Sequence, residues 1–303
     1  MKILVYGSLN VDLIFSVDHI VRPGETISSS AFKRSAGGKG ANQSAALAKA
    51  GMEVYLAGKI GQDGLFLIDL LKSYGVNTNN VIIDEGSTGQ ALIQVDKKGQ
   101  NSIVLNAGGN YRITIDEIKK TLKYFSIGDA VLLQNEIVHT KEIMLAAKEQ
   151  GLRIYLNPSP FDEGIKSLPL ELVDIFFVNE IEAASLAGMM IPPPNLPQRG
   201  RSSLAEMLAA QFPNSEIVLT AGEEGAFYAH KTAEGMHTEH CGIVEVPVVD
   251  TTGAGDTFSG YFLAGMTKGL GPAECLTLAS KAASIAVSRP GAMDSVPYER
   301  ELA

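Results

Sequence analysis

Short, continuously apolar segments recur along the chain, and segments with helical character lie between most of them. The apolar segments are rich in β-branched and aromatic residues, which is typical of strands buried on both faces of a sheet. They cover residues 2–7, 53–58, 130–134, 153–157, 174–179 and 216–220. The expected helices cover 39–50, 63–74, 114–124, 139–150, 179–187, 202–212, 255–268 and 272–287. The alternation predicts an α/β fold with a parallel sheet covered on both faces, and ligands at the carboxyl ends of its strands.

Two segments depart from this alternation and have the pattern of β-hairpins. Residues 11–35 and 88–106 carry alternating polar residues, with turn signals at "RPGE" and "KKGQ". They predict a small separate sheet outside the main layer, from which a lid could form. A chain of 303 residues is long enough for one large domain or for two, so length leaves the domain count open.

Charge and cysteine content exclude several classes of partner and site. The chain has 25 Lys and Arg against 34 Asp and Glu, a net charge of -9, which argues against nucleic acid or an anionic membrane as the main ligand. Cys241 and Cys275 are far apart and show no metal-type spacing, so neither a disulfide framework nor a zinc site is expected. No signal peptide or membrane-spanning run is found. These features predict a cytoplasmic protein.

The stretch "VVDTTGAGDTFSG" (248–260) follows a strand-like segment, "IVEVPVV" (243–249), and leads into an expected helix. A dinucleotide fingerprint fails because Phe258 stands where the third glycine belongs, and no GxxxxGK[ST] phosphate loop occurs in the chain. An anion hole remains, formed by the backbone N–H groups of Ala254, Gly255 and Asp256 at the helix start. The alternative is an ordinary glycine-rich helix cap. The Asp256 carboxylate favours the anion hole, because it is well placed to accept a proton from an alcohol that attacks a phosphate.

Three further polar clusters follow expected strands and should converge at one edge of the sheet. Asn10 and Asp12 follow the first strand and suit paired bonds to vicinal hydroxyls, or form an Asx turn. Lys39 and Asn42 lie about one helical turn apart in "AGGKGANQ" (36–43), which is also compatible with a helix start packed closely through glycine. Glu136 closes a strand, where it is either a ligand contact or a surface carboxylate.

Two other clusters have competing explanations. Asn179 and Glu182 share a helix face and could meet hydrated magnesium or phosphate, or they form a capping box. Residues 219–229 have the pattern strand, turn, strand, and their glycines line a nucleotide or make a turn. "HTEHC" (237–241) is interpreted as a solvated hairpin segment rather than a metal site, because no other His or Cys cluster completes a ligand set.

Taken together, these motifs resemble those of the ribokinase family of sugar kinases, also called phosphofructokinase-B-type carbohydrate kinases. The resemblance runs from about residue 2 to residue 301. It rests most strongly on "GGKGANQSAALA" and "DTTGAGDTFSG", and also on "GSLNVD", "RPGET", "STGQALIQV", "LNPSP", "VNEIEA" and "AASIAVSRPGAMDSVP". It implies a single kinase domain over 1–303, a Rossmann-like three-layer sandwich. It also implies a β lid (about 11–35 and 88–106) that closes on the sugar and pairs with a second subunit in a homodimer.

The resemblance also assigns roles to individual positions. Asp256 matches the catalytic base and Gly253, Ala254 and Gly255 the anion hole. Sugar-binding positions are matched by Asn10, Asp12, Gly38, Lys39, Asn42, Glu136 and Asp256. Nucleotide-contacting positions are matched by Asn179, Thr220, Gly222, Gly225, Gly255 and Ser280, with Glu182 tied to magnesium and phosphate. A monovalent-cation loop, which takes potassium in the family, is matched by Asp250, Thr252, Ala286, Arg289, Gly291 and Ser295.

The implied activity is transfer of the γ-phosphoryl group of MgATP to the primary hydroxyl of a pentose, with ribose as the expected sugar. The alternatives are a kinase for another substrate, such as fructose, deoxyribose, ketodeoxygluconate or a nucleoside, and a sugar- or nucleotide-binding regulator without catalysis. Two departures from the family pattern stand out. Phe66 replaces the last glycine of a GxDxxG motif, and a proline-rich loop, 191–203, follows the helix of Asn179 and Glu182.

Overall fold

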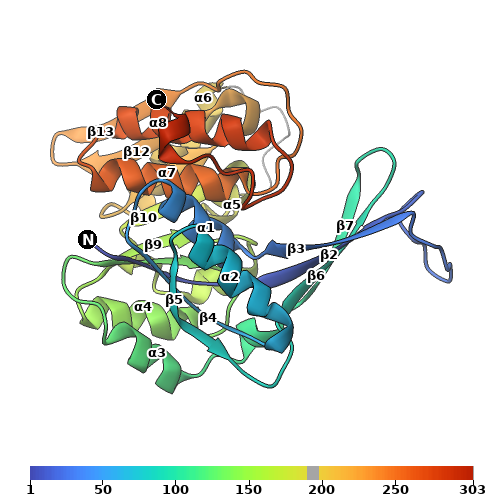
Figure 1. The fold of residues 1–303 in the computed structure, drawn as a ribbon. Helices are drawn as coiled ribbons and strands as arrows, with labels where there is room; N and C mark the ends of the chain where they lie inside the picture. Colours follow the sequence, from blue (N-terminus) through green and yellow to red (C-terminus); the bar gives the residue numbers. More distant parts are fainter. Residues whose placement is uncertain (190–197, 303) are drawn as a thin grey trace.

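The computed structural model describes residues 1–189 and 198–302. Within these ranges, nine strands form one large sheet, and helices cover both of its faces (Figure 1). In spatial order the strands are β13 (Gly235–Cys241), β12 (Ala226–Thr232), β11 (Glu216–Thr220), β10 (Ile175–Asn179), β9 (Arg153–Asn157), β8 (Ala130–Gln134), β1 (Ile3–Tyr6), β4 (Val54–Ile60) and β5 (Asn77–Ile83). The strands from β11 to β5 pair in parallel, and β12 and β13 add an antiparallel edge.

Alternate residues of the first strand separate the two helical layers. Ile3 and Val5 pack into one apolar core, whereas Leu4 and Tyr6 pack into the other. The first core includes α1 (Lys39–Lys49), α2 (Leu65–Ser73), α7 (Ala254–Thr267) and α8 (Pro272–Val287). The second core includes α3 (Ile115–Leu122), α4 (Thr140–Glu149), α5 (Glu180–Leu186) and α6 (Gln198–Gln211). The predicted three-layer α/β architecture is confirmed.

A second sheet of four strands projects from the main body (Figure 1). Its order is β3 (Ala31–Gly37), β2 (Asn10–Ser16), β6 (Gly89–Val95) and β7 (Asn101–Asn106). The outer pairs are antiparallel and the central pair is parallel. Both predicted turn signals form turns, because the Glu25 N–H donates to Arg22 O (3.0 Å) and the Gly99 N–H to Asp96 O (3.0 Å). The separate small sheet expected from the sequence is therefore present.

Three sequence expectations need comment. The prediction that residues 243–249 form a strand is wrong. Residues 242–253 take no regular secondary structure, and Val248 is 65% exposed. β5 was not expected, since its first half, "NTNN", is polar. The predicted loop 191–203 lies partly outside the described residues, and α6 begins at Gln198, earlier than expected. In the described part of the chain, no helix has both the length and the apolar character needed to cross a membrane.

Candidate functional site

A cavity of about 230 Å³ opens where the strands β9, β10 and β11 end and α7 begins. The last residue of each strand lines it, as expected for the carboxyl edge of a parallel sheet. Its polar lining includes Asn157, Asn179, Thr220, Lys39, Glu182 and Asp256, together with the backbone of Gly253, Ala254 and Gly255. The cavity thus brings residues from the N-terminal, middle and C-terminal parts of the chain to one place.

The start of α7 offers unbonded backbone donors to this cavity. Gly253 has a left-handed backbone (φ 75°), a conformation that glycine adopts without a steric penalty. The Ala254 N–H donates to Thr251 O at 3.2 Å, so it is not free as the sequence predicted. The N–H groups of Gly255 and Asp256 donate to no group in the described part of the chain. Two amides at a helix N-terminus therefore remain to bind an anion.

Two amide side chains of α1 hold the carboxylate of Asp256. Asn42 Nδ2 donates to Asp256 Oδ2 at 3.0 Å, and Gln43 Nε2 donates to Asp256 Oδ1 at 2.8 Å. Gln43 also donates to Asn157 Oδ1 at 3.2 Å and accepts from Gln134 Nε2 at 2.7 Å. Asp256 is only 7% exposed. This amide network fixes the direction in which the carboxylate faces the cavity.

The sequence analysis did not assign Gln43 or Gln134 to the site. Both are completely buried polar side chains, and Gln134 ends β8 at the same sheet edge as the cavity. Gln43 follows Asn42 directly, inside a motif already assigned to the site. The available signals were a polar residue at the end of an apolar predicted strand, for Gln134, and a place inside the glycine-rich motif, for Gln43.

Glu136 and Lys39 join the first strand to α1. Glu136 Oε2 accepts from the Lys39 backbone N–H at 3.1 Å and from the Ser8 hydroxyl. Burial alone would lower the pKa of the Lys39 ammonium, but the negative charges of Asp256, Glu136 and Glu182 outweigh it and raise the pKa. Gly38 (φ 93°) lies where a Cβ would be 2.8 Å from Ser8 O. Lys39 is therefore a permanent positive charge beside three carboxylates.

Asp12 lies at the base of the small sheet, on the side of Glu136. A Cβ on Gly37 would overlap its carboxylate, so a glycine there leaves the room that Asp12 needs. Burial, and to a smaller extent the negative charge of Glu136, raises the pKa of Asp12 to about 7. Asn10, at the start of β2, is 7% exposed. Asn10, Asp12, Gly38, Lys39 and Glu136 thus gather around one junction, as predicted.

Asn179 and Glu182 form the capping box that the sequence left as an alternative. Asn179 Oδ1 accepts from the Glu182 N–H at 2.9 Å, and Glu182 Oε2 accepts from the Asn179 N–H at 2.9 Å. Both residues also line the cavity, and Glu182 Oε1 accepts no hydrogen bond from the described residues. An oxygen of this kind fits a hydrated magnesium ion through water. The cap therefore leaves one carboxylate oxygen for the ligand.

The predicted nucleotide-contacting residues divide into two groups. Asn179, Thr220 and Gly255 line the cavity, whereas Gly222, Gly225 and Ser280 do not. Gly222 and Gly225 both have positive φ in the turn after β11. A Cβ on Gly225 would overlap Cys241 O, so close packing against β13 accounts for that glycine.

The predicted cation loop joins two distant segments. Asp250 Oδ1 accepts from the Thr252 N–H at 2.9 Å, and Asp250 Oδ2 accepts from the Gly291 N–H at 2.9 Å. The Arg289 N–H donates to Ala286 O at 3.0 Å, and the Ser295 hydroxyl donates to Ala292 O at 2.8 Å. Asp250 therefore links two of the other predicted positions, Thr252 and Gly291, beside the start of α7, whereas the bonds of Arg289 and Ser295 are local ones that do not involve Asp250.

"HTEHC" forms most of β13, at the edge of the large sheet. His237 Nε2 is 3.0 Å from Glu239 Oε1, and the His240 ring stacks on Phe227 with ring centroids 4.4 Å apart. Across residues 1–189 and 198–302, no cluster of three or more His, Cys, Asp or Glu side chains has an arrangement that could hold a metal ion.

Comparison with known proteins relates the whole chain to one family. Residues 1–299 match the model of the pfkB family of carbohydrate kinases. The chain is 32% identical to a ribokinase of Haemophilus influenzae, over 98% of this chain and 95% of the relative. It resembles the crystal structure of a Cryptococcus neoformans ribokinase in complex with ADP (TM-score 0.87, 34% identity, 99% and 98% coverage). It also resembles an Arabidopsis thaliana ribokinase complexed with ribose and ATP (TM-score 0.84, 28% identity, 99% and 97% coverage).

Proposed function

The chain belongs to the pfkB family of carbohydrate kinases, and from this premise we propose that it transfers the γ-phosphoryl group of ATP to the primary hydroxyl of D-ribose, giving ribose 5-phosphate. The observation that carries the proposal is the buried Asp256 carboxylate, oriented by Asn42 and Gln43 beside the two unbonded amides at the start of α7. The relatives named as ribokinases over their full length support ribose as the sugar.

In the proposed mechanism, the junction at the base of the small sheet binds and orients the sugar. Asn10, Asp12 and Glu136 hold hydroxyl groups there, and Lys39 and Asn42 lie between this junction and the phosphate cavity. In a sugar bound in this way, the primary hydroxyl would lie next to the Asp256 carboxylate. Positioning and electrostatics supply most of the rate of phosphoryl transfer, because the reaction needs little covalent chemistry from the protein.

At the chemical step, the hydroxyl oxygen forms a bond to the γ-phosphorus, its proton passes to an Asp256 carboxylate oxygen, and ADP leaves. The N–H groups of Gly255 and Asp256 stabilise the charge that spreads over the phosphoryl oxygens. Asn179, Thr220 and Glu182 lie on the phosphate side of the cavity. Glu182 would hold a magnesium ion through water, and the ion would neutralise negative charge on the nucleotide phosphates. A potassium ion would be held at the proposed cation loop, where its positive charge would stabilise the nearby anion hole; the loop positions are Asp250, Thr252, Ala286, Arg289, Gly291 and Ser295.

One coupled assay tests the activity, the substrate and the cation together. ADP formation is measured with ribose, deoxyribose, fructose, ketodeoxygluconate and nucleosides, each in sodium and in potassium buffer. We expect ribose in potassium to give the highest kcat/KM. If another acceptor gave the highest kcat/KM, ribose would be rejected as the substrate, but the kinase activity would stand. Absence of ADP formation with every acceptor would favour a binding regulator.

We predict that sugar binding strengthens as pH rises through the raised pKa of Asp12. The carboxyl has a pKa of about 7 in the folded protein, against a usual value of 3.8, so it is protonated at pH 6 and ionised at pH 8. The carboxylate is the better acceptor for sugar hydroxyls. The KM for ribose should therefore fall between pH 6 and pH 8. Asp12→Asn should remove most of this dependence, and an unchanged profile in that variant would contradict the prediction.

The same raised pKa makes the sugar-free protein less stable, not more, as pH rises. Between about pH 4 and pH 7 the folded protein retains a proton on Asp12 that the unfolded chain has lost. The Asp12 contribution to the free energy of unfolding thus falls as pH rises through that range. Ribose should offset this loss at pH 8, and thermal melts with and without ribose would measure the difference.

We propose that the small sheet acts as a lid and pairs with the small sheet of a second copy. It exposes several large apolar side chains: Phe32 (58%), Val104 (62%), Leu105 (54%), Ile103 (51%) and Leu92 (41%). Sedimentation should show a homodimer. Val104→Asp should shift the protein to monomer, whereas Ile127→Asp, at an 86% exposed position in the loop after α3, should not. Equal effects of the two variants would place the interface elsewhere.

The cytoplasmic location remains a prediction. It rests on the two cysteines, Cys241 and Cys275, which are both free. Fractionation of cells that produce the protein would test it.

A further inference from the structure

A buried side chain outside the predicted site contacts one of the proposed sugar ligands. Asn110 lies in the short helix η2 (Gly108–Tyr111), just after the last strand of the small sheet, and is 2% exposed. Asn110 Nδ2 donates to Asn10 Oδ1 at 2.8 Å, and Asn110 Oδ1 accepts from the Leu9 N–H at 3.1 Å. Both ends of its amide are therefore bonded, and the acceptor role toward the Leu9 backbone fixes which end faces Asn10.

The bond to Asn110 determines what Asn10 can offer a ligand. Asn10 Oδ1 is occupied by Asn110, whereas Asn10 Nδ2 donates to no other residue in the described part of the chain. An amide held in this way presents its NH₂ group, a donor, to an incoming hydroxyl oxygen. Without the partner, the Asn10 amide could rotate by half a turn and present an acceptor instead.

The surrounding backbone leaves room for this pair and little more. A Cβ on Gly89 would overlap both Asn10 Oδ1 and Asn110 Nδ2. A Cβ on Gly108 would overlap Thr88 O, and one on Gly109 would overlap Lys59 O. Close approach of three backbone segments therefore encloses the two amides.

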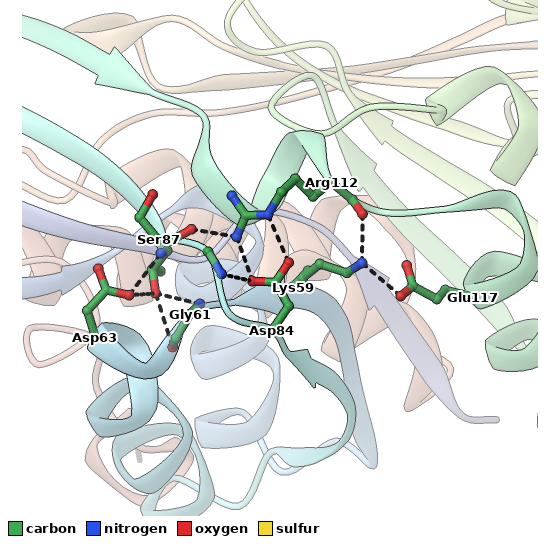
Figure 2. Close-up of polar contacts among 9 residues, drawn as sticks. Lys59, Gly61, Asp63, Asp84, Ser87, Arg112 and Glu117 are labelled. Carbon is green, nitrogen blue, oxygen red and sulfur yellow. Dashed lines mark hydrogen bonds and ion pairs between the residues drawn. The ribbon is translucent and has the colours of Figure 1, made fainter.

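A polar network fastens the same segments to the main sheet (Figure 2). Arg112 donates to both carboxylate oxygens of Asp84 (2.8 and 2.7 Å) and to Ser87 O (2.8 Å), and it lowers the pKa of Asp84. Lys59 Nζ donates to Arg112 O at 2.6 Å and pairs with Glu117 at 2.7 Å. The chain two residues beyond Asn110 is thus held to the end of β4.

The segment that leads into Gly89, which packs against Asn110, is also held by side-chain hydrogen bonds. Asp63 Oδ1 accepts from the Thr88 N–H at 2.9 Å and from the Thr88 hydroxyl at 2.6 Å, directly before Gly89. Asn110 O also accepts from the Val138 N–H at 3.2 Å, two residues after Glu136. Asn110 therefore links the start of β2, the end of β7 and the segment that carries Glu136.

We propose that Asn110 is a positioning residue for sugar binding, which holds the Asn10 amide with its NH₂ group toward a hydroxyl oxygen of the sugar. The inference rests on the proposed function, since it assumes that Asn10 contacts the acceptor sugar. Asn110 itself does not touch the sugar and acts through Asn10 and Gly89.

The test is Asn110→Asp, which keeps the shape and the acceptor for the Leu9 N–H but removes the donor to Asn10. We expect the KM for ribose to rise by about tenfold, the loss of roughly one hydrogen bond of 1.4 kcal/mol, with the KM for ATP and kcat changed little. Gly89→Ala should produce the same split from the other side of the pair. Asn106→Asp is the matched control, since Asn106 pairs with Gln90 on the face opposite Asp12 and should leave the KM for ribose unchanged.

A double-mutant cycle separates positioning from a general structural effect. In an Asn10→Ala background, Asn110→Asp should cause no further rise in the KM for ribose, because the group it positions is gone. An equal rise in both backgrounds, or an unchanged KM in the single variant, would overturn the role of Asn110. Wild-type enzyme is assayed beside each variant. If it phosphorylates no sugar, the proposed function itself fails, and a wild type that is active beside an unaffected Asn110→Asp rejects the positioning role alone.

Discussion

Asp256→Asn should lower kcat by a factor of about 10² to 10⁴, because the variant keeps the shape of the side chain but cannot accept the proton of the sugar hydroxyl. The amide introduced would also turn an NH₂ group toward Asn42 or Gln43, both of which donate to the carboxylate in the wild type. The KM for ribose should change little, since the sugar is held by other residues.

Steady-state kinetics and a thermal melt of the same preparation would check this prediction. Asp116→Asn is a matched control, because Asp116 is also an acidic residue in the first turn of a helix but is exposed on α3. It should leave kcat unchanged. Near-wild-type turnover of Asp256→Asn would mean that another group accepts the proton.

Gly255→Ala should separate activity from stability at the anion hole. A Cβ at Gly255 would have no atom within 4 Å and the backbone is not left-handed, so the folded protein can accept it. Alanine also has the higher helix propensity, by up to about 1 kcal/mol. Yet Gly255 lines the cavity, and the added methyl group would occupy space where phosphoryl oxygens approach the N–H groups. We expect kcat/KM for ATP to fall by about 10² to 10³, with an unchanged or higher melting temperature.

Gly260→Ala in the same helix should behave in the opposite way. A Cβ there would lie 2.6 Å from Ala46 Cβ, between α7 and α1. Overpacking of this contact should lower the free energy of unfolding by about 1–3 kcal/mol.

If Gly255→Ala kept full activity, the open space beside Gly255 would not be where the phosphates lie, and the anion hole would have to be placed elsewhere.

The sequence predicted the main sheet well because its strands are buried on both faces and therefore continuously apolar. β8, β9 and β11 begin and end at the residues expected. The same criterion failed at 243–249, where an apolar run is exposed and only Val249 donates to a neighbouring segment, at Val287 O. It also missed β5, where an edge position lets polar residues replace apolar ones. An apolar run predicts a strand reliably only where the segment is buried in the middle of a sheet. Residues 243–249 are apolar but exposed, and β5 is a strand at the edge of the sheet that tolerates polar residues.

Within the site, residues at the ends of predicted strands could be assigned from the sequence, whereas a residue outside the strands could not. Residues at the ends of predicted strands, such as Asn179 and Thr220, could be placed because parallel topology brings strand ends together. Asn110 could not, since it lies outside the predicted strands and its partner Asn10 is 100 residues away, so their contact depends on how separate elements pack. Sequence alone also could not decide between a capping box and a ligand contact at Asn179 and Glu182, where the structure has the cap and leaves an oxygen to spare.

The small sheet is joined to the main body at four points, at Asn10, Gly37, Gly89 and Asn106. Asn10 is itself a proposed sugar ligand, Gly37 precedes Gly38, and Gly89 packs against Asn10 and Asn110. These are the only places where the chain passes between the small sheet and the main body, among the described residues. Rotation of the small sheet must be absorbed by backbone torsions at these roots, where Gly38 and Gly108 both have positive φ. We therefore expect any change in the angle of the small sheet to change the geometry of the proposed sugar pocket as well.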